Sequence, residues 1–341
     1  MTAPIHNNPP APKRLFAWGD SRPFYGSARY YRNTFDCVIR KLSIDAGFSC
    51  PNRDGRVGVG GCTFCNNDAF SPAYATARRT ITEQMEEGRK FHARSFVEGA
   101  KWLVYFQAFS NTYAPVEVLR ARYMEALQAD DVAGLIIGTR PDCVDEQVLD
   151  LVAELRQTHY IAVEFGMESA FDSTLQKVNR GHGWQESVRA VEMCHQRAIP
   201  CGGHFIIGLP GETDEMILQT FDRINDLRLD TVKFHQLQIF RGTAMERDFV
   251  SHPENYRFFT PDEYVALLAE GIRHLRPNTA VERIVSEVPP SYRHEGLGWQ
   301  GMRSHHVINR LCAYLEQNGA FQGELFGRFE KFRGEDWTLF A

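Results

Sequence analysis

The chain has 341 residues, enough for one large or two ordinary domains. With 43% hydrophobic and 24% charged residues it is not mainly disordered, collagen-like or of low complexity. The net charge of −5 is unevenly spread, because residues 1–60 carry nine Lys and Arg against four Asp, and the remainder is acidic. No apolar run approaches the roughly 20 residues that span a membrane, and the first residues lack the apolar core of a secretion signal, so we expect a soluble, cytoplasmic protein.

A basic, aromatic arm is expected at residues 1–34. Its first dozen residues contain four Pro and two Asn, which predicts disorder. The aromatic residues that follow among the basic ones are Phe16, Trp18, Phe24, Tyr25, Tyr30 and Tyr31. Such an arm can stack on the bases of a nucleic acid beside neutralised phosphates, or it can pack against the rest of the protein. We favour packing for most of these aromatic side chains.

Strands and helices alternate after the arm. The predicted strands are 38–45, 101–109, 134–139, 160–166, 201–208 and 231–240, and the predicted helices are 81–94, 116–128, 144–157, 184–197, 214–228 and 261–275. Pro115 and Pro261 mark helix entries, and Thr213 and Thr260 are candidate N-caps. Spacings of 30–40 residues between strands are typical of right-handed parallel crossovers, which close into an open sheet or a full or partial barrel. A strand at 281–288 and a helix at 301–317 follow.

Three of the eight cysteines, Cys50, Cys62 and Cys65, fall in one Gly-, Asn- and Asp-rich segment that reads as a loop. The other five are scattered singly and need no role beyond packing. A loop can fold three thiolates around one centre. A structural zinc site normally has four protein ligands, and no Cys or His follows until His92. Three thiolates suit a [4Fe–4S] cluster with one open iron, while a zinc site completed by a distant His remains an alternative.

Polar residues follow the predicted strands at the end where the cysteine loop lies. They include Gln107, Ser110, Thr139, Arg140, Glu164, Glu168, His235, Gln236 and Gln238, and Gly208 after the fifth strand permits close backbone approach to a ligand. Ligands of parallel α/β folds bind at the carboxyl ends of the strands. As a set, these residues therefore predict the lining of a polar ligand cavity.

The cysteine loop, with Phe64 just before the last cysteine, resembles that of the radical S-adenosylmethionine superfamily. Its spacing of eleven and two residues departs from the superfamily's commonest pattern. It is similar to the branch that holds the Elongator catalytic subunit's radical domain and the YhcC/YtqA-type proteins. The motifs that carry this resemblance are GFSCPNRDG, GGCTFCNNDAFSP, YFQAFSNTYAP, GTRPDCV, EFGMES and HFIIGLPGET. They run from about residue 35 to 242, and the similarity continues more weakly to about 325.

The resemblance implies an α/β fold: a partial (β/α)6 radical-SAM barrel at 35–276 with its cluster loop at 48–71, a flexible arm at 1–34 and a short α+β extension at 277–341. It implies that Cys50, Cys62 and Cys65 ligate a [4Fe–4S] cluster and that S-adenosyl-L-methionine binds beside it. The cofactor-binding positions implied are Phe64, Gln107, Ala108, Phe109, Ser110, Thr139, Arg140, Glu164, Glu168 and Gly208. Relatives carry Gly-Gly-Glu where this chain has Gln107 to Ser110, so the role of that segment is in question.

By the same resemblance, the chain is expected to cleave S-adenosylmethionine reductively to a 5'-deoxyadenosyl radical, with electrons from an external donor such as flavodoxin or ferredoxin. His235 and Gln238 are the candidates for orienting substrate. The Elongator-type relatives act on the wobble uridine of tRNA, so modification or trimming of that uridine's side chain is the leading hypothesis. A radical enzyme acting on a small metabolite or peptide is the alternative, and a zinc-stabilised, non-catalytic binding module is a more distant one.

Overall fold

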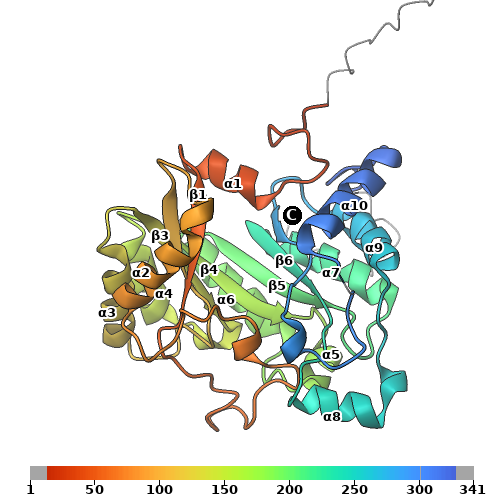
Figure 1. Cartoon of the computed structure of the whole chain (residues 1–341), viewed down its shortest axis with the longest axis horizontal. Coiled ribbons are helices and arrows are strands. Elements are labelled where there is room, and N and C mark those ends of the chain that lie inside the picture. Colours follow the sequence, from red (N-terminus) through yellow and green to blue (C-terminus); the bar gives the residue numbers. More distant parts are fainter. Residues whose placement is uncertain (1–13, 300, 328–341) are drawn as a thin grey trace, which may run out of the picture.

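The computed structural model describes residues 14–299 and 301–327, and a single curled parallel sheet forms the centre of this part of the chain (Figure 1). Its strands lie side by side in chain order and every neighbouring pair is parallel. They are β1 Ile39–Ile44, β2 Lys101–Phe106, β3 Val132–Thr139, β4 Tyr160–Glu168, β5 Cys201–Ile207, β6 Thr231–Gln236 and β7 Ala280–Arg283. The α/β half-barrel predicted from the sequence is confirmed.

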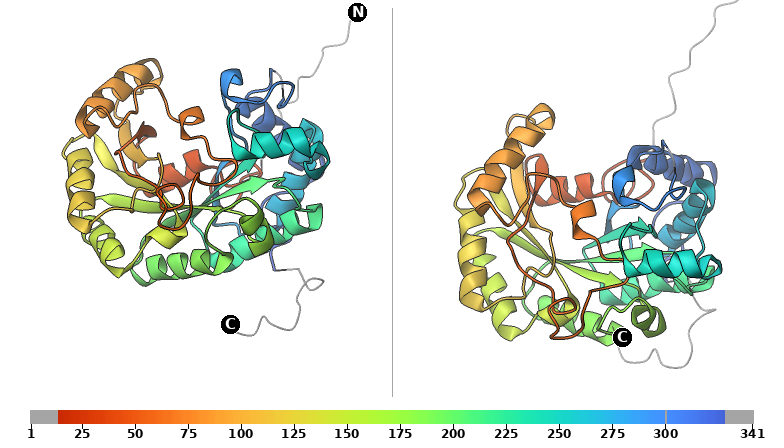
Figure 2. Two further views of the ribbon diagram at one scale, coloured as in Figure 1. Left: turned by 90° about the horizontal axis from the view of Figure 1, so that it is seen from below. Right: turned by 60° about the horizontal axis from the view of Figure 1, so that its bottom comes forward.

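Helices cover the outer face of the curled sheet (Figure 2). Residues of the inner face line a cavity, and the space inside the curl is called the lumen below. The α-helices are α1 Ser27–Thr34, α2 Ile81–His92, α3 Val116–Leu127, α4 Glu146–Leu155, α5 Asp172–Lys177, α6 Trp184–Gln196, α7 Asp214–Leu227, α8 Ala244–Ser251, α9 Pro261–His274 and α10 Ser304–Gln317. Short 3-10 turns lie at Asn67–Ala69, Ala93–Ser95, Pro141–Cys143, Pro253–Asn255 and Pro290–Tyr292. No helix in the described ranges is long and apolar enough to cross a membrane.

Side-chain capping fixes where several helices begin. The Thr213 hydroxyl accepts a hydrogen bond from the Met216 amide, and Thr260 forms a capping box with Glu263, so both predicted N-caps are confirmed. Pro261 occupies the first turn of α9, where no amide donor is needed. These local signals explain why the sequence predicted the helix boundaries closely.

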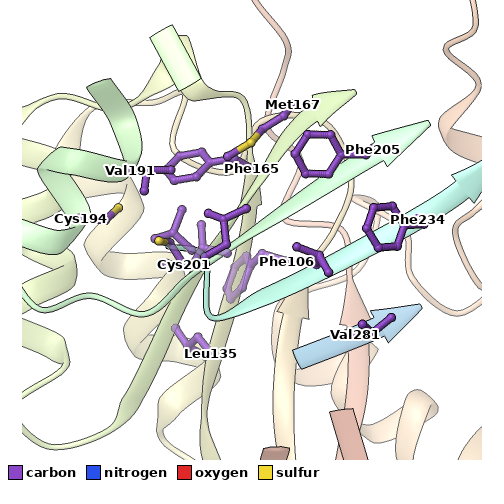
Figure 3. Packing of buried hydrophobic residues seen from close by; sticks show 14 of the residues in the cluster. Phe106, Leu135, Phe165, Met167, Val191, Cys194, Cys201, Phe205, Phe234 and Val281 are labelled. Atoms are coloured by element: carbon purple, nitrogen blue, oxygen red, sulfur yellow. The ribbon is translucent and has the colours of Figure 1, made fainter. Parts of the chain in front are cut away.

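Alternation along the strands separates the core from the lumen. On β4, Phe165 and Met167 are fully buried, and Phe165 points toward Val191 and Cys194 of α6 (Figure 3). Because neighbouring residues of a strand point to opposite faces, Glu164 and Glu168 point to the inner side of the sheet. The outer face thus holds the main hydrophobic core, while the inner face carries polar side chains together with a smaller apolar cluster that includes Leu103, Tyr105 and Ile136.

Two features of the fold differ from the sequence prediction. The strand expected at 281–288 is shorter, ends at Arg283, and joins the barrel sheet as its seventh strand instead of lying in a separate extension. The short helices α1, α5 and α8 were not predicted. Helices this short are marginal by themselves and depend on tertiary packing, which leaves little periodicity in the sequence.

The arm closes the gap between β1 and β7, which are not paired with each other. The Val281 amide donates to the Tyr25 carbonyl (2.7 Å), and Gly26 forms an isolated bridge with Val281. Trp18, Phe24 and Tyr25 are buried, as is Tyr31, so the predicted packing of these aromatic residues is confirmed. The disorder expected for the first dozen residues concerns positions outside the described ranges.

Candidate active site at the carboxyl ends of the strands

A cavity of about 230 Å³ opens inside the curled sheet at the carboxyl ends of its strands. Its lining includes the three loop cysteines and most of the predicted site residues: Cys50, Cys62, Phe64, Cys65, Gln107, Ala108, Phe109, Ser110, Thr139, Arg140, Glu164, Glu168, His235 and Gln238. Gly208 is not part of the lining. Its φ is +91°, and a Cβ there would lie 3.0 Å from the Phe259 ring. Glycine therefore allows the left-handed backbone of the turn after β5 and the close packing of Phe259 against it.

The cysteine loop is docked on the segment that follows α5. The Asn52 side chain is buried and donates to the Asn179 carbonyl (2.6 Å), and the Asn179 amide nitrogen donates back to the Gly61 carbonyl (2.8 Å). The Thr63 amide donates to the Val178 carbonyl (3.0 Å). These bonds hold a loop without regular secondary structure in one place, so its thiols are presented at the cavity mouth.

Arg180 is a site residue that the sequence reasoning missed. Its guanidinium is buried; Nη1 lies 3.3 Å from the Cys62 Sγ, and Nη2 donates to the Gly166 carbonyl (2.5 Å). Burial lowers the pKa of Arg180, but Cys62 and Glu168 outweigh it and raise the pKa above its ordinary value. Arg180 therefore remains a cation beside a thiol. It follows a short unpredicted helix and no strand, so no pattern in the sequence marked it.

The residues at this end fit the iron–sulfur cluster and polar cofactor that the sequence implies. Three soft sulfur donors line one end of the cavity, and buried polar atoms without hydrogen-bond partners lie there: Ser110 Oγ, Arg140 Nη1 and Arg180 Nε. Buried polar groups normally find partners, so these atoms are suited to a bound polar molecule. Within residues 14–299 and 301–327, no three His, Cys, Asp or Glu side chains surround a single-ion position.

The thiol of Cys65 is expected to be protonated before any cluster binds. Burial, followed by the neighbouring Cys62, raises the pKa of Cys65 to about 11. Since cluster ligands are thiolates, loading must release this proton. Assembly of the site is therefore coupled to proton loss.

Strained backbone lies at the same end of the sheet. Phe109 and Glu168, which follow β2 and end β4, have φ values of +61° and +68°. Non-glycine residues adopt this conformation rarely, and such positions gather at functional sites. Both are among the cofactor-binding positions predicted from the sequence, and their assignment to the cofactor stays a prediction.

An ion-pair network of Lys41, Glu164, Lys233 and Glu282, called the buried ion-pair network below, joins strands β1, β4, β6 and β7, and its Glu164 and Lys233 line the cavity. Glu164 lies 2.5 Å from Lys233 Nζ and 3.5 Å from Lys41 Nζ, and Glu282 lies 2.9 Å and 2.6 Å from the same two atoms. Burial raises the pKa of Glu164, but the two lysines dominate and hold it well below its ordinary value. The network is therefore charged.

Two further polar side chains of the cavity lining contact this network. His204 Nε2 is 2.9 Å from Glu164, and the Tyr105 hydroxyl lies 3.3 Å from Lys233 Nζ. Glu164, predicted to bind the cofactor, lines the cavity and also belongs to this network, and its assignment to the cofactor stays a prediction. Glu168 instead lies 3.8 Å from Arg180, at the cysteine end.

His235 and Gln238, the proposed substrate-orienting residues, are both held by Ser286. The Ser286 hydroxyl bonds the His235 Nδ1, and the Ser286 carbonyl accepts from the Gln238 amide nitrogen (2.9 Å). The Gln238 Oε1 is buried without a partner. The segment after β7 thus positions both residues at the cavity wall.

Comparison with known proteins gives two family matches. The model described as the Radical SAM superfamily matches residues 52–224, and the model described as the Radical_SAM C-terminal domain matches residues 229–317. The chain is 34% identical to protein YtqA of Bacillus subtilis (strain 168) over 96% of its own length and 98% of that protein. It is 37% identical to protein YhcC of Escherichia coli (strain K12) over 85% and 91% of the two chains.

More distant similarities concern shorter regions or the fold alone. A tRNA uridine(34) acetyltransferase of Methanocaldococcus infernus is 28% identical over 33% of this chain and 21% of that protein. The solved structure of archaeal Methanocaldococcus infernus Elp3 with an N-terminal deletion superposes with a TM-score of 0.62 at 15% identity. It covers 83% of this chain, which spans 64% of the Elp3 chain.

Proposed function

Because the chain belongs to the radical S-adenosylmethionine superfamily, whose members use a [4Fe–4S] cluster and S-adenosylmethionine, we propose that it modifies or trims the side chain of a wobble uridine in tRNA. The single observation that carries the chemistry is the cavity in which Cys50, Cys62 and Cys65 face the polar carboxyl ends of the strands. The tRNA substrate is supported by the similarity to a tRNA uridine(34) acetyltransferase and by the Elp3-like fold.

Each part of the cavity has a proposed role. Cys50, Cys62 and Cys65 ligate the cluster, and Arg180 orients Cys62 through its hydrogen bond. Ser110, Arg140 and Glu168 bind the polar ends of S-adenosylmethionine in this proposal, which is supported by their position in the cavity lining and by the unpartnered Ser110 Oγ and Arg140 Nη1. When bound, the cluster and S-adenosylmethionine would supply radical chemistry: with one electron from an external donor, cleavage of the cofactor to methionine would provide the hydrogen-abstracting 5'-deoxyadenosyl group.

The protein itself positions the substrate and excludes water. Neutral His235 and the amide of Gln238 present hydrogen-bonding groups from the wall that Ser286 holds in place. Phe64 and Phe240 line the cavity with apolar surface beside these groups. A reactive radical requires this combination of fixed orientation and limited solvent access.

The first experiment tests the cofactor chemistry. The protein is reconstituted anaerobically with iron and sulfide, reduced with dithionite, given S-adenosylmethionine, and assayed for 5'-deoxyadenosine. Wild type and Cys312→Ala, which alters a cysteine remote from the cavity, are expected to form it, while Cys62→Ala is expected to lose at least about 99% of the activity. Equal activity of the two variants would contradict the ligand assignment.

The second experiment tests the substrate. The active enzyme is incubated with tRNA from cells that lack this protein, and the nucleosides are analysed by mass spectrometry. A mass change confined to the wobble uridine supports the proposal. If deoxyadenosine forms but no tRNA nucleoside changes, the tRNA substrate is wrong and a small metabolite or peptide becomes the better candidate.

A further inference from the structure

A second cavity, of about 200 Å³, lies beside the candidate active site. The two cavities share one stretch of wall, residues 236–238, at the end of β6 and just after it. None of the three loop cysteines lines the second cavity. It is therefore a neighbour of the active-site cavity and lies apart from the cluster ligands.

Hydrogen bonds between three segments build the walls of the second cavity. The His294 amide donates to the Ile239 carbonyl (2.9 Å), which ties the loop 293–299 to the segment after β6. The Trp299 indole N–H donates to the Phe259 carbonyl (2.8 Å), which ties the same loop to the segment before α9. The walls are thus held together by the fold itself, before any ligand binds.

Apolar side chains form much of these walls, namely Leu237, Ile239, Phe259, Leu297 and Trp299. Leu297 packs against the small buried cluster that contains Leu237 and Ile239. An apolar cavity of about 150 Å³ is large enough to hold one six-membered ring. The second cavity therefore has the size and the surface for a single ring with apolar faces.

Two residues of the walls each carry a buried polar atom without a partner among the described residues. Gln238 donates through its amide nitrogen to the Ser286 carbonyl (2.9 Å), which leaves its Oε1 as an acceptor without a donor. Arg293 Nε is a donor without an acceptor. A side chain at Gly298 would collide with the Arg293 guanidinium, so glycine lets Arg293 lie against the loop. One acceptor and one donor match the edge of a pyrimidine base such as uracil, where an N–H lies next to a carbonyl.

We propose that the second cavity binds the pyrimidine base of a nucleotide next to the reacting uridine. The proposal rests on the proposed function, which makes the substrate a single-stranded loop of RNA. Proteins recognise such loops by splaying the bases apart and binding each one by its faces and its edge. Gln238 belongs to the walls of both cavities, so a base held in the second cavity keeps the reacting nucleotide at the first.

The test measures how tightly trinucleotides bind to the reconstituted full-length protein with S-adenosylmethionine bound. UpUpU is compared by calorimetry with two analogues in which the 5' or the 3' base is replaced by hydrogen. Both analogues keep every sugar and phosphate, so a difference in affinity reports on the base alone. For the wild type, removal of one of the two outer bases is expected to weaken binding at least about fivefold, as loss of a stacked base does.

Two variants link this difference to the second cavity. Leu297→Trp fills the cavity and Arg293→Met removes its donor, and neither residue lines the first cavity. Both variants are expected to bind UpUpU and the weaker analogue equally and still to form 5'-deoxyadenosine. Leu15→Trp, at a leucine that is 74% exposed in the arm, is the matched control and is expected to keep the difference.

Two outcomes would overturn the proposal. One is that removal of neither outer base weakens binding by the wild type. The other is that the difference persists in both Leu297→Trp and Arg293→Met. Since methionine is similar in length to the aliphatic part of arginine, Arg293→Met keeps the test decisive if the larger tryptophan disturbs folding.

Failure of the tRNA hypothesis would look different. Free uracil has no sugar or phosphate, and its effect on the unfolding midpoint is compared between Leu15→Trp and Leu297→Trp. If uracil stabilises Leu15→Trp more than Leu297→Trp while UpUpU binds no better than uridine, the second cavity binds a pyrimidine ring and the RNA substrate is wrong. If tRNA is modified but uracil affects both variants equally and neither outer base matters, the second cavity is not a base-binding site.

Discussion

Glu164 and Glu168 lie on the same face of β4, yet their surroundings differ. Glu164 is bound by Lys41, Lys233 and His204, and it shares the two lysines with the Glu282 carboxylate. Glu168 has a left-handed backbone and lies near Arg180 at the cysteine end. Of the two glutamates, Glu168 is therefore the better candidate for the cofactor, and this assignment stays a prediction.

Glu212, in the loop after β5, is predicted to make stability depend on pH. Burial raises its pKa to about 7, while hydrogen bonds from Ser169 and Thr174 oppose this. The native state holds the proton more tightly than the unfolded state, whose pKa is 4.5. Protonation of Glu212 therefore contributes up to about 3 kcal/mol to the free energy of unfolding. This contribution is complete below pH 4.5 and is lost as the pH rises through about 7.

Urea unfolding at several pH values checks this prediction. Glu212→Gln keeps the shape of the neutral acid and does not ionise, so its stability relative to wild type is expected to increase from pH 5 to pH 8. Glu215→Gln, an exposed glutamate three residues away, is the control and should show no such increase. Parallel curves for wild type and Glu212→Gln would show that Glu212 is not a buried acid.

At the scale of elements, the cysteine loop and β7 depend on partners far away in the sequence. Asn52 of the loop is bound by the backbone of Asn179, across 127 positions. β7 has only four residues and is completed by β6 on one side and by the arm on the other. Neither element has enough local signal to determine its own conformation, so both form only when the sheet is assembled.

The buried ion-pair network joins the two ends of the open sheet, and breaking it is predicted to be costly. Glu282 of β7 bonds Lys41 of β1, although the two strands share no backbone ladder. Glu282→Gln leaves the buried Lys233 and the partly exposed Lys41 with one carboxylate, so a loss of about 3 kcal/mol in the free energy of unfolding is expected. Urea denaturation measures it.

A surface pair provides the comparison for this experiment. Glu270 pairs with Arg273 on the partly exposed face of α9, and Glu270→Gln is expected to cost at most about 1 kcal/mol. If the two variants lose similar stability, the network does not hold β1 and β7 together, and closure of the sheet must come from the arm.

At the scale of the whole molecule, the arm and the cavity mouth lie in different parts of the fold. The arm packs between β1 and β7, where Arg14 stacks on Phe16 and Phe321, and Arg29 donates to the Trp18 carbonyl (2.9 Å). The mouth is formed by the cysteine loop and the segments after the strands. The basic arm singled out by its composition is thus used largely for closure of the barrel.

The salt dependence of tRNA binding is expected to show whether the arm or the region around the cavity mouth contacts the tRNA phosphates. The sequence raised the expectation that neutralising Lys13, Arg14, Arg29 and Arg32 lowers the salt slope; Lys13 lies outside the described ranges. We instead expect Arg56→Gln, in the cysteine loop, and Arg241→Gln, next to the cavity-lining Phe240, to lower the slope by about 0.7–0.9 for each phosphate that is no longer neutralised. Arg14→Gln with Arg32→Gln is expected to leave it nearly unchanged, and the reverse result would restore the arm as the tRNA-binding surface.

The sequence by itself determined the alternation of strands and helices, the cysteine loop and the superfamily. These features are local: periodicity, caps such as Thr213 and Thr260, and the spacing of Cys50, Cys62 and Cys65 are properties of neighbouring residues. They led to the half-barrel and to most of the cavity lining.

Only the tertiary structure decided which side chains meet in the lumen. Lys41, Lys233 and Glu282 look like ordinary surface charges in the sequence, because nothing local shows that their strands converge on Glu164. Arg180 follows a short helix, and Glu282 is the extra residue of a bulge in β7, from which it reaches Lys41 and Lys233. Contacts between residues more than a hundred positions apart depend on how the sheet curls, and no local pattern encodes them.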